Sequence, residues 1–205
     1  MPLEQRRAAI IHATLPLVRA HGQAVTTRQI AAAAGIAEGT IFRVFADKNA
    51  LIQAVIESAF DPTPLEDDLA TLSVEGDLRA RVTAAIALLE RRVAGIWDLM
   101  SALRRMPPAV DTGARRGGPV PRSMPFAESR ERVMAALTKL FEDDRDRLRC
   151  EPAVAAKLLR ALAFGGTHPA IIDGDPLSAD DIAAVLLDGI LLRPSHPDPG
   201  GTSTC

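Results

Sequence analysis

Apolar residues recur along the chain at spacings of three and four, and short alternating runs bounded by hairpin turns are missing. Because a helix brings positions i, i+3, i+4 and i+7 to one face, this pattern predicts an all-α protein. The first predicted helix covers residues 3–21, and Gly22 is expected to end it. Pro16 lies inside this helix, so we expect a kink or a loosened turn there.

Three shorter helices are predicted next, each with its own start or stop signal. Residues 26–29, Thr-Thr-Arg-Gln, have the composition of a capping box, and Gly35 is a typical helix stop. Asp47 is placed to cap the last of the three helices. The predicted ranges are 26–34, 38–45 and 48–60.

A second domain is expected beyond residue 60. Residues 61–64, Asp-Pro-Thr-Pro, interrupt the periodicity, and we place a domain boundary there. Longer helices are predicted at about 77–106, 126–149, 152–168 and 178–192. The predicted organisation is a first domain at 1–60, a second at 61–193 with a long loop at 107–125, and a disordered tail at 194–205.

Composition narrows the class of protein. The chain has 205 residues, of which 47% are hydrophobic and 24% charged, as in ordinary globular proteins. Only 3% are aromatic, which argues against single-strand nucleic-acid binders that stack bases on aromatic rings. The two cysteines show neither disulfide nor metal spacing, and no secretory signal or membrane-length apolar run is seen. We expect a soluble cytoplasmic protein without metal or cofactor.

The charge and the turn near the start point to a nucleic-acid partner. Residues 1–60 carry six cations and four anions, whereas the rest carries 18 cations and 22 anions. This asymmetry favours contact between the first domain and a polyanion. The two short helices on either side of Gly35 have the layout of a helix-turn-helix, in which the second helix enters the major groove. Gly39 and Thr40 are small enough for such a close approach.

Several motifs within residues 26–51 are more specific. They are Thr-x-Arg-x-Ile-Ala at the start, a glycine turn, Gly-Thr-Ile-Phe in the second helix and Phe-x-x-Lys-x-x-Leu at the end. Together they resemble the DNA-binding signature of the TetR family of transcriptional regulators, over about residues 5–55. The resemblance implies an all-α fold with an N-terminal three-helix, helix-turn-helix DNA-binding domain and a C-terminal helical domain that binds an effector and dimerises.

The resemblance also implies roles for individual residues in DNA binding. Lys48 would bind a phosphate at the start of its helix. Phe42 stands where tyrosine is common in the family, so the phosphate contact of that hydroxyl is lost, and Val44 also departs from the family pattern. The expected DNA-binding residues are Thr27, Arg28, Glu38, Gly39, Thr40, Phe42, Arg43 and Lys48.

Simpler roles stay open for four of these residues. Glu38 could act on the helix dipole alone, and Phe42 could belong to the core. Arg28 and Arg43 could be merely solvated. The whole motif could also serve protein contacts instead of DNA.

The last two predicted helices are strongly apolar. The resemblance implies that they pair with a second copy of the chain, and a two-fold dimer suits a palindromic operator. The alternative is that their apolar faces fill the core of one chain. The expected interface residues are Leu158, Leu162, Ile182, Val185, Leu186 and Ile190.

A small-molecule pocket is also implied by the resemblance. Its candidate lining consists of large apolar residues on the enclosing helices and one histidine, each of which could instead be structural: Trp97, Met100, Leu103, Met134, Leu137, Phe164 and His168.

The sequence therefore predicts a homodimeric repressor of double-stranded, palindromic operator DNA that an unknown small-molecule effector releases. No converging catalytic constellation is found, so an enzyme is not predicted. The alternative is a helical small-molecule-binding or sequestering protein that no longer binds DNA. Phe42 and the modest charge of the first domain motivate this alternative.

Overall fold

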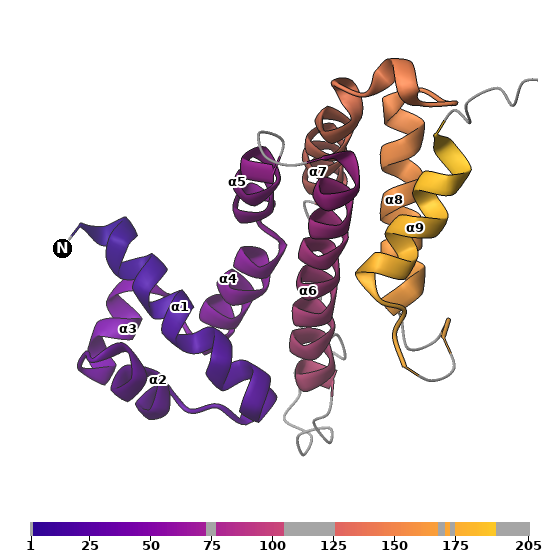
Figure 1. Cartoon of the computed structure of the whole chain (residues 1–205). Helices are drawn as coiled ribbons and strands as arrows, with labels where there is room; N and C mark the ends of the chain where they lie inside the picture. Colours follow the sequence, from indigo (N-terminus) through magenta and orange to yellow (C-terminus); the bar gives the residue numbers. More distant parts are fainter. Residues whose placement is uncertain (1, 73–76, 105–125, 168–170, 173–174, 192–205) are drawn as a thin grey trace, which may run out of the picture. The chain divides into compact units, whose positions relative to one another are not determined.

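The computed structural model describes residues 2–72, 77–104, 126–167, 171–172 and 175–191. Within these ranges the chain is helical and contains no strand, which confirms the all-α prediction (Figure 1). Leu148 and Leu191 form an isolated antiparallel bridge. The α-helices are α1 (Leu3–His21), α2 (Thr27–Ala34), α3 (Glu38–Val44), α4 (Lys48–Phe60), α5 (Thr63–Leu72), α6 (Leu78–Arg104), α7 (Phe126–Glu142), α8 (Pro152–Thr167) and α9 (Ala179–Ile190), with 3-10 turns η1 (Gly22–Ala24) and η2 (Arg145–Arg147).

Side-chain caps fix the starts of three helices. At α2 the Thr26 hydroxyl accepts a hydrogen bond from the Gln29 amide (3.2 Å), and the Gln29 side chain accepts one from the Thr26 amide (2.8 Å). Asp47 accepts from the amide of Ala50 at the start of α4 (2.7 Å), and Ser178 caps α9. Each such cap stabilises its helix by about 0.5–2 kcal/mol.

The structure corrects the sequence prediction at two places. The segment interpreted as a break begins α5, because Asp61 accepts from the Thr63 amide (3.0 Å) and Pro64 lies in the first turn, where a proline is tolerated. The α7 helix ends at Glu142, before the predicted end at residue 149, and η2 follows it. The α1 helix has the predicted bounds, with Pro16 inside it, and the kink expected there stays a prediction.

Contacts divide the chain into two units that differ from the predicted domains. Unit 1 consists of described residues within 1–68 and 88–133, and unit 2 of those within 69–87 and 134–205. Both α6 and α7 contribute residues to each unit. The boundary placed at residue 61 from the sequence therefore stays a prediction.

The core of unit 1 joins the first four helices to the end of α6. Ile10, Ile30 and Ile41 are buried in it together with Leu99 and Leu103 of α6. The α1 helix ends against α6 at Gly22, where the backbone has φ +57° and an added Cβ would lie 2.4 Å from the Ala102 carbonyl oxygen. The helix-turn-helix thus shares its core with a helix distant in sequence.

Unit 2 is held by the packing of α8 beside α9 and by an ion-pair cluster (Figure 1). Asp144, just after α7, binds Arg81 of α6 (2.5 Å) and Arg147 of η2 (2.6 Å). The side chains of Arg81 and Asp144 are both largely shielded from solvent. The cluster lies where α7 has ended and the 3-10 turn η2 begins.

Candidate nucleic-acid interface

A tight turn joins α2 to α3. Gly35 adopts the left-handed conformation (φ +65°), and the amides of Gly35 and Ile36 donate to the carbonyls of Ala32 and Ala31 (3.3 and 3.0 Å). The Cβ position of Gly35 is open, so its backbone conformation is what favours glycine here. The turn sets α3 across the end of α2, as the sequence predicted.

The outward side of α3 carries the predicted recognition residues. Glu38, Gly39 and Arg43 are exposed, and Phe42 is 51% exposed. This exposure contradicts the alternative that Phe42 belongs to the core. The apolar side of α3 is buried through Ile41, followed by Phe45. The helix therefore presents one side to solvent and packs the other.

Two of the predicted DNA-binding residues contact each other. The Thr27 hydroxyl, at the start of α2, donates a hydrogen bond to Glu38 Oε1 at the start of α3. This contact ties the two helices together at their N-terminal ends, a use of Glu38 that the sequence did not indicate. Arg28, the neighbour of Thr27, remains exposed.

Lys48 also has a partner within the chain. Its Nζ donates to the carbonyl oxygen of Gln23 in η1 (2.5 Å), and partial burial lowers the pKa of Lys48 from its ordinary value. The side chain therefore braces the start of α4 against the connection that follows α1. A phosphate bound at this place would meet a lysine that is already held in position.

Arg7 lies over the ring of Phe45, with its guanidinium carbon 4.7 Å from the ring centroid. Such a contact is a cation–π interaction, and it fixes the first turns of α1 against the end of α3. The sequence analysis missed it, because 38 positions of the chain separate the two residues.

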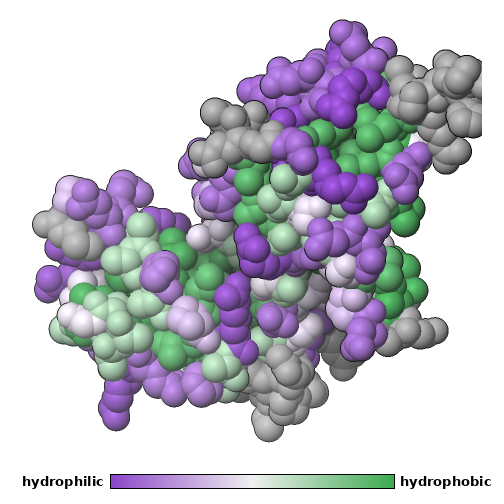
Figure 2. All heavy atoms as spheres, viewed as in Figure 1, coloured by the Kyte–Doolittle hydropathy of each residue, from purple (hydrophilic) through white to green (hydrophobic). Residues whose placement is uncertain are grey.

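The predicted interface residues on α8 and α9 divide into two groups. Leu158, Leu162 and Val185 are exposed, at 41%, 37% and 68%. Ile182, Leu186 and Ile190 are buried inside unit 2, so for them the alternative of filling one chain's core is the one observed. The sequence did not select Val154 of α8, which is also exposed. Figure 2 shows hydrophobic side chains at the surface over α8 and α9.

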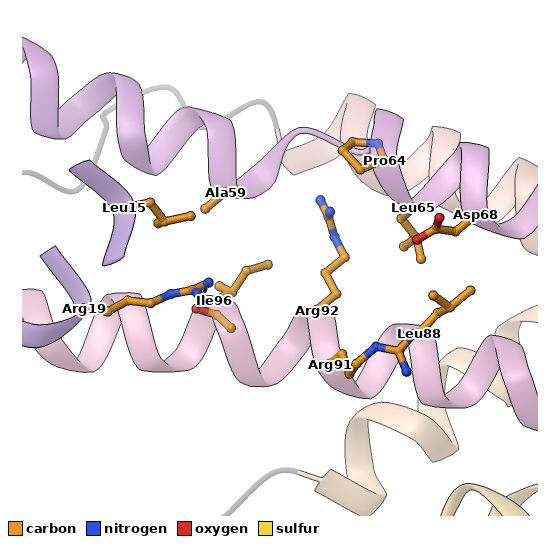
Figure 3. A pocket seen from close by; sticks show the side chains of 11 residues that line it. Leu15, Arg19, Ala59, Pro64, Leu65, Asp68, Leu88, Arg91, Arg92 and Ile96 are labelled. Atoms are coloured by element: carbon orange, nitrogen blue, oxygen red, sulfur yellow. Dashed lines mark hydrogen bonds between the residues drawn. The ribbon is translucent and has the colours of Figure 1, made fainter. Parts of the chain in front are cut away.

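An open pocket of about 290 Å³ lies within unit 1 (Figure 3). Residues from four helices, α1, α4, α5 and α6, line it. We call it the arginine pocket because it contains three arginines among apolar side chains. Its lining is Leu15, Arg19, Ala59, Pro64, Leu65, Asp68, Leu88, Arg91, Arg92, Gly95 and Ile96.

None of the residues selected from the sequence as pocket lining belongs to the arginine pocket. Leu103 is buried in the core of unit 1 and Met100 packs against that core, so these two are structural. Leu137 is fully buried and Phe164 is exposed. Trp97 and Met134 are half-buried, and His168 lies outside the described residues.

Two other properties concern the described residues as a whole. No described helix has the length and apolar character needed to cross a membrane. No group of three or more potential metal ligands was found in the described part of the chain.

Comparison with known proteins agrees with this geometry. Residues 10–55 match the model of the bacterial regulatory proteins of the tetR family. An uncharacterized HTH-type transcriptional regulator of Mycobacterium tuberculosis is 32% identical over 73 residues, which are 36% of this chain and 31% of that protein. The chain thus spans about a third of the length of the curated relatives that it matches.

Solved structures share the fold over nearly the whole chain. A TetR transcriptional regulator of Streptomyces coelicolor superposes with a TM-score of 0.55 at 23% identity, covering 93% of this chain and 99% of that one. SmeT, the repressor of the SmeDEF multidrug efflux pump of Stenotrophomonas maltophilia, gives a TM-score of 0.56 at 19% identity, covering 97% and 96%. SmeT also has a solved complex with triclosan. Residues 10–55 thus match the tetR family model, and the described helices share their fold with solved TetR regulators.

Proposed function

We propose that the protein is a sequence-specific DNA-binding transcriptional regulator, a homodimer that represses from a palindromic operator and is released by a small-molecule effector. The observation that carries the DNA-binding part is the surface of α3. Gly39 has no atom within 4 Å of an added Cβ, so no packing within the described residues accounts for its small size. A helix that enters the major groove does account for it, because its first turn must approach the base edges closely.

The residues around Gly39 supply the chemistry of recognition. Arg43 is exposed and can donate two hydrogen bonds to guanine or bind a phosphate. Phe42 offers an exposed ring that can contact a thymine methyl group. Lys48 and Arg28 flank α3 and supply positive charge for the phosphate backbone.

A second copy of the chain is the proposed partner of α8 and α9. Leu158 and Leu162 are one helical turn apart on α8, and Val185 is exposed on α9. A two-fold partner would cover these side chains and would place two recognition helices on successive half-sites. The effector is proposed by analogy with SmeT, for which a triclosan complex is known.

Binding to the DNA that flanks the protein's own gene tests the proposal. Fluorescence anisotropy at several salt concentrations should show tight binding with a steep salt slope, because phosphate neutralisation releases counterions. Footprinting should show protection of a palindrome. We expect Arg43→Ala to weaken binding by about 5- to 150-fold, corresponding to about 1–3 kcal/mol for one good base contact.

Arg130→Ala is the matched control, since Arg130 is an exposed arginine on α7 outside the interface. It should leave the affinity nearly unchanged. If the wild-type protein bound neither this DNA nor a randomised duplex pool, the regulator would be rejected in favour of a helical small-molecule-binding or sequestering protein.

A further inference from the structure

The arginine pocket is lined by apolar side chains and by positively charged side chains. Leu15, Leu65 and Ile96 give it an apolar wall, and Arg19, Arg91 and Arg92 bring positive charge. Figure 3 shows Arg92 extending from α6 across the pocket toward the junction of α4 and α5. Asp68 is the one carboxylate among the lining residues, so the described lining carries a net positive charge.

The arginines of this pocket lack close acidic partners among the described residues. The salt bridges found there include none made by Arg19, Arg91 or Arg92. Arg92 is half-buried, and burial lowers its pKa while Asp61 acts in the opposite direction from beyond salt-bridge distance. A partly desolvated guanidinium with no carboxylate within salt-bridge distance is stabilised by an anion that enters from solvent.

Arg19 is held in place by a hydrogen bond to a neutral carbonyl group, and its positive charge is not neutralised by that contact. Its Nη2 donates to the Gly95 carbonyl oxygen (3.4 Å). An added Cβ at Gly95 would lie 3.0 Å from that same nitrogen, so the glycine leaves room for the guanidinium. The remaining donors of Arg19 stay available, since a guanidinium has five N–H groups.

We propose that the arginine pocket binds an amphipathic organic anion, a carboxylate with an apolar body, and that this anion is the effector. The second half of this inference rests on the proposed function. The carboxylate would accept hydrogen bonds from Arg92 and Arg19, and the apolar body would lie against the leucines and Ile96. A volume of about 290 Å³ suits a small ligand.

The pocket is connected to the DNA-binding helices through its walls. Leu15 and Arg19 belong to α1, whose Thr14 and Val18 are buried in unit 1. Ala59 belongs to the last turn of α4, the helix that starts at Lys48. An anion that binds one arrangement of α1, α4 and α6 better than another would shift the position of the recognition helix. Such coupling typically changes affinity by about 5- to 150-fold.

Isothermal titration calorimetry on the full chain without DNA tests the pocket by itself. The probes are octanoate, benzoate and indole-3-acetate, each paired with its neutral alcohol: octan-1-ol, benzyl alcohol and indole-3-ethanol. We expect at least one anion to bind, and to bind at least tenfold more tightly than its alcohol. If none of the three anions binds, or the alcohols bind equally well, the proposal is overturned.

Substitutions assign any binding to this pocket. Arg92→Met keeps an unbranched apolar side chain but removes the charged guanidinium, and it should weaken anion binding at least tenfold. Arg104→Met is the matched control, because Arg104 is an exposed arginine on the same helix outside the pocket. If Arg92→Met does not fold by circular dichroism, Arg91→Met takes its place. Unchanged anion binding in the folded variant would move the site elsewhere and overturn the assignment.

The DNA assay then separates the two proposals. Adding the bound anion should release wild-type protein from DNA and leave Arg92→Met bound. Anion binding without any DNA binding would keep the pocket and reject the regulator. DNA binding that no anion alters would keep the regulator and reject the anion as its effector.

Discussion

Two glycines of unit 1 have opposite surroundings. Gly22 has a positive φ and an added Cβ would collide with the Ala102 carbonyl oxygen, so the fold itself requires it. Gly39 has an ordinary helical backbone and open space around it. Of the two, only Gly22 is required by the packing and backbone of unit 1.

Gly39→Ala should therefore separate function from stability. We expect DNA affinity to fall at least tenfold, because the methyl group would hold α3 away from the base edges. The free energy of unfolding should stay the same or rise by up to about 1 kcal/mol, since alanine favours the helix. Anisotropy and thermal unfolding measure the two effects.

Gly22→Ala is the contrasting variant. It should lower the free energy of unfolding by about 1–2 kcal/mol for the backbone conformation alone, and by more through the collision with Ala102. Unchanged DNA affinity in a stable Gly39→Ala protein would contradict the role given to Gly39.

At the scale of elements, local signals predicted helix starts and stops well. Thr26, Gly35 and Asp47 act through their own or neighbouring backbone groups, so the sequence alone places them. Just after the end of α7, by contrast, Asp144 binds Arg81 from 63 positions away in sequence, a contact that no local pattern indicates. The arginine pocket was missed for the same reason, because four separate helices supply its lining and periodicity within one helix carries no sign of it.

The Asp144 cluster should be important for the stability of unit 2. Asp144→Asn keeps the shape of the side chain but removes the negative charge that binds the largely shielded Arg81 and also Arg147. We expect the free energy of unfolding to fall by on the order of 3 kcal/mol, measured by urea denaturation.

Glu142→Gln provides the comparison for this variant. Its ion pair with Arg145 is well exposed, with side chains 44% and 54% accessible, and should contribute about 0–1 kcal/mol. If both substitutions lowered the free energy of unfolding equally, the shielding of the Arg81–Asp144 ion pair from solvent would have no importance for stability.

At the scale of the whole molecule, the proposed dimer depends on the exposed apolar residues of α8 and α9. Val185→Glu places a charge at the most exposed of these positions (68%). We expect a shift from dimer to monomer in sedimentation velocity, because an unpaired charge in an interface is costly to desolvate. The affinity for DNA should also fall, since a monomer can contact only one half-site and therefore binds weakly.

Leu3→Glu controls for the loss of an exposed apolar side chain. Leu3 is 60% exposed on α1, far along the sequence from α8 and α9, and its replacement should leave the oligomeric state unchanged. A wild-type protein that sediments as a monomer at micromolar concentration would count against the dimer.

The contribution of α6 to the core of the helix-turn-helix limits how this protein can be recombined with its relatives. Leu99 and Leu103 fill that core, and Ala102 lies against Gly22. A chimera that transplants residues 1–60 onto another protein's ligand domain would bring no α6 of its own. Residues 1–60 therefore lack part of their own core, and any substitution in the first four helices must stay compatible with the surface of α6 that packs against them.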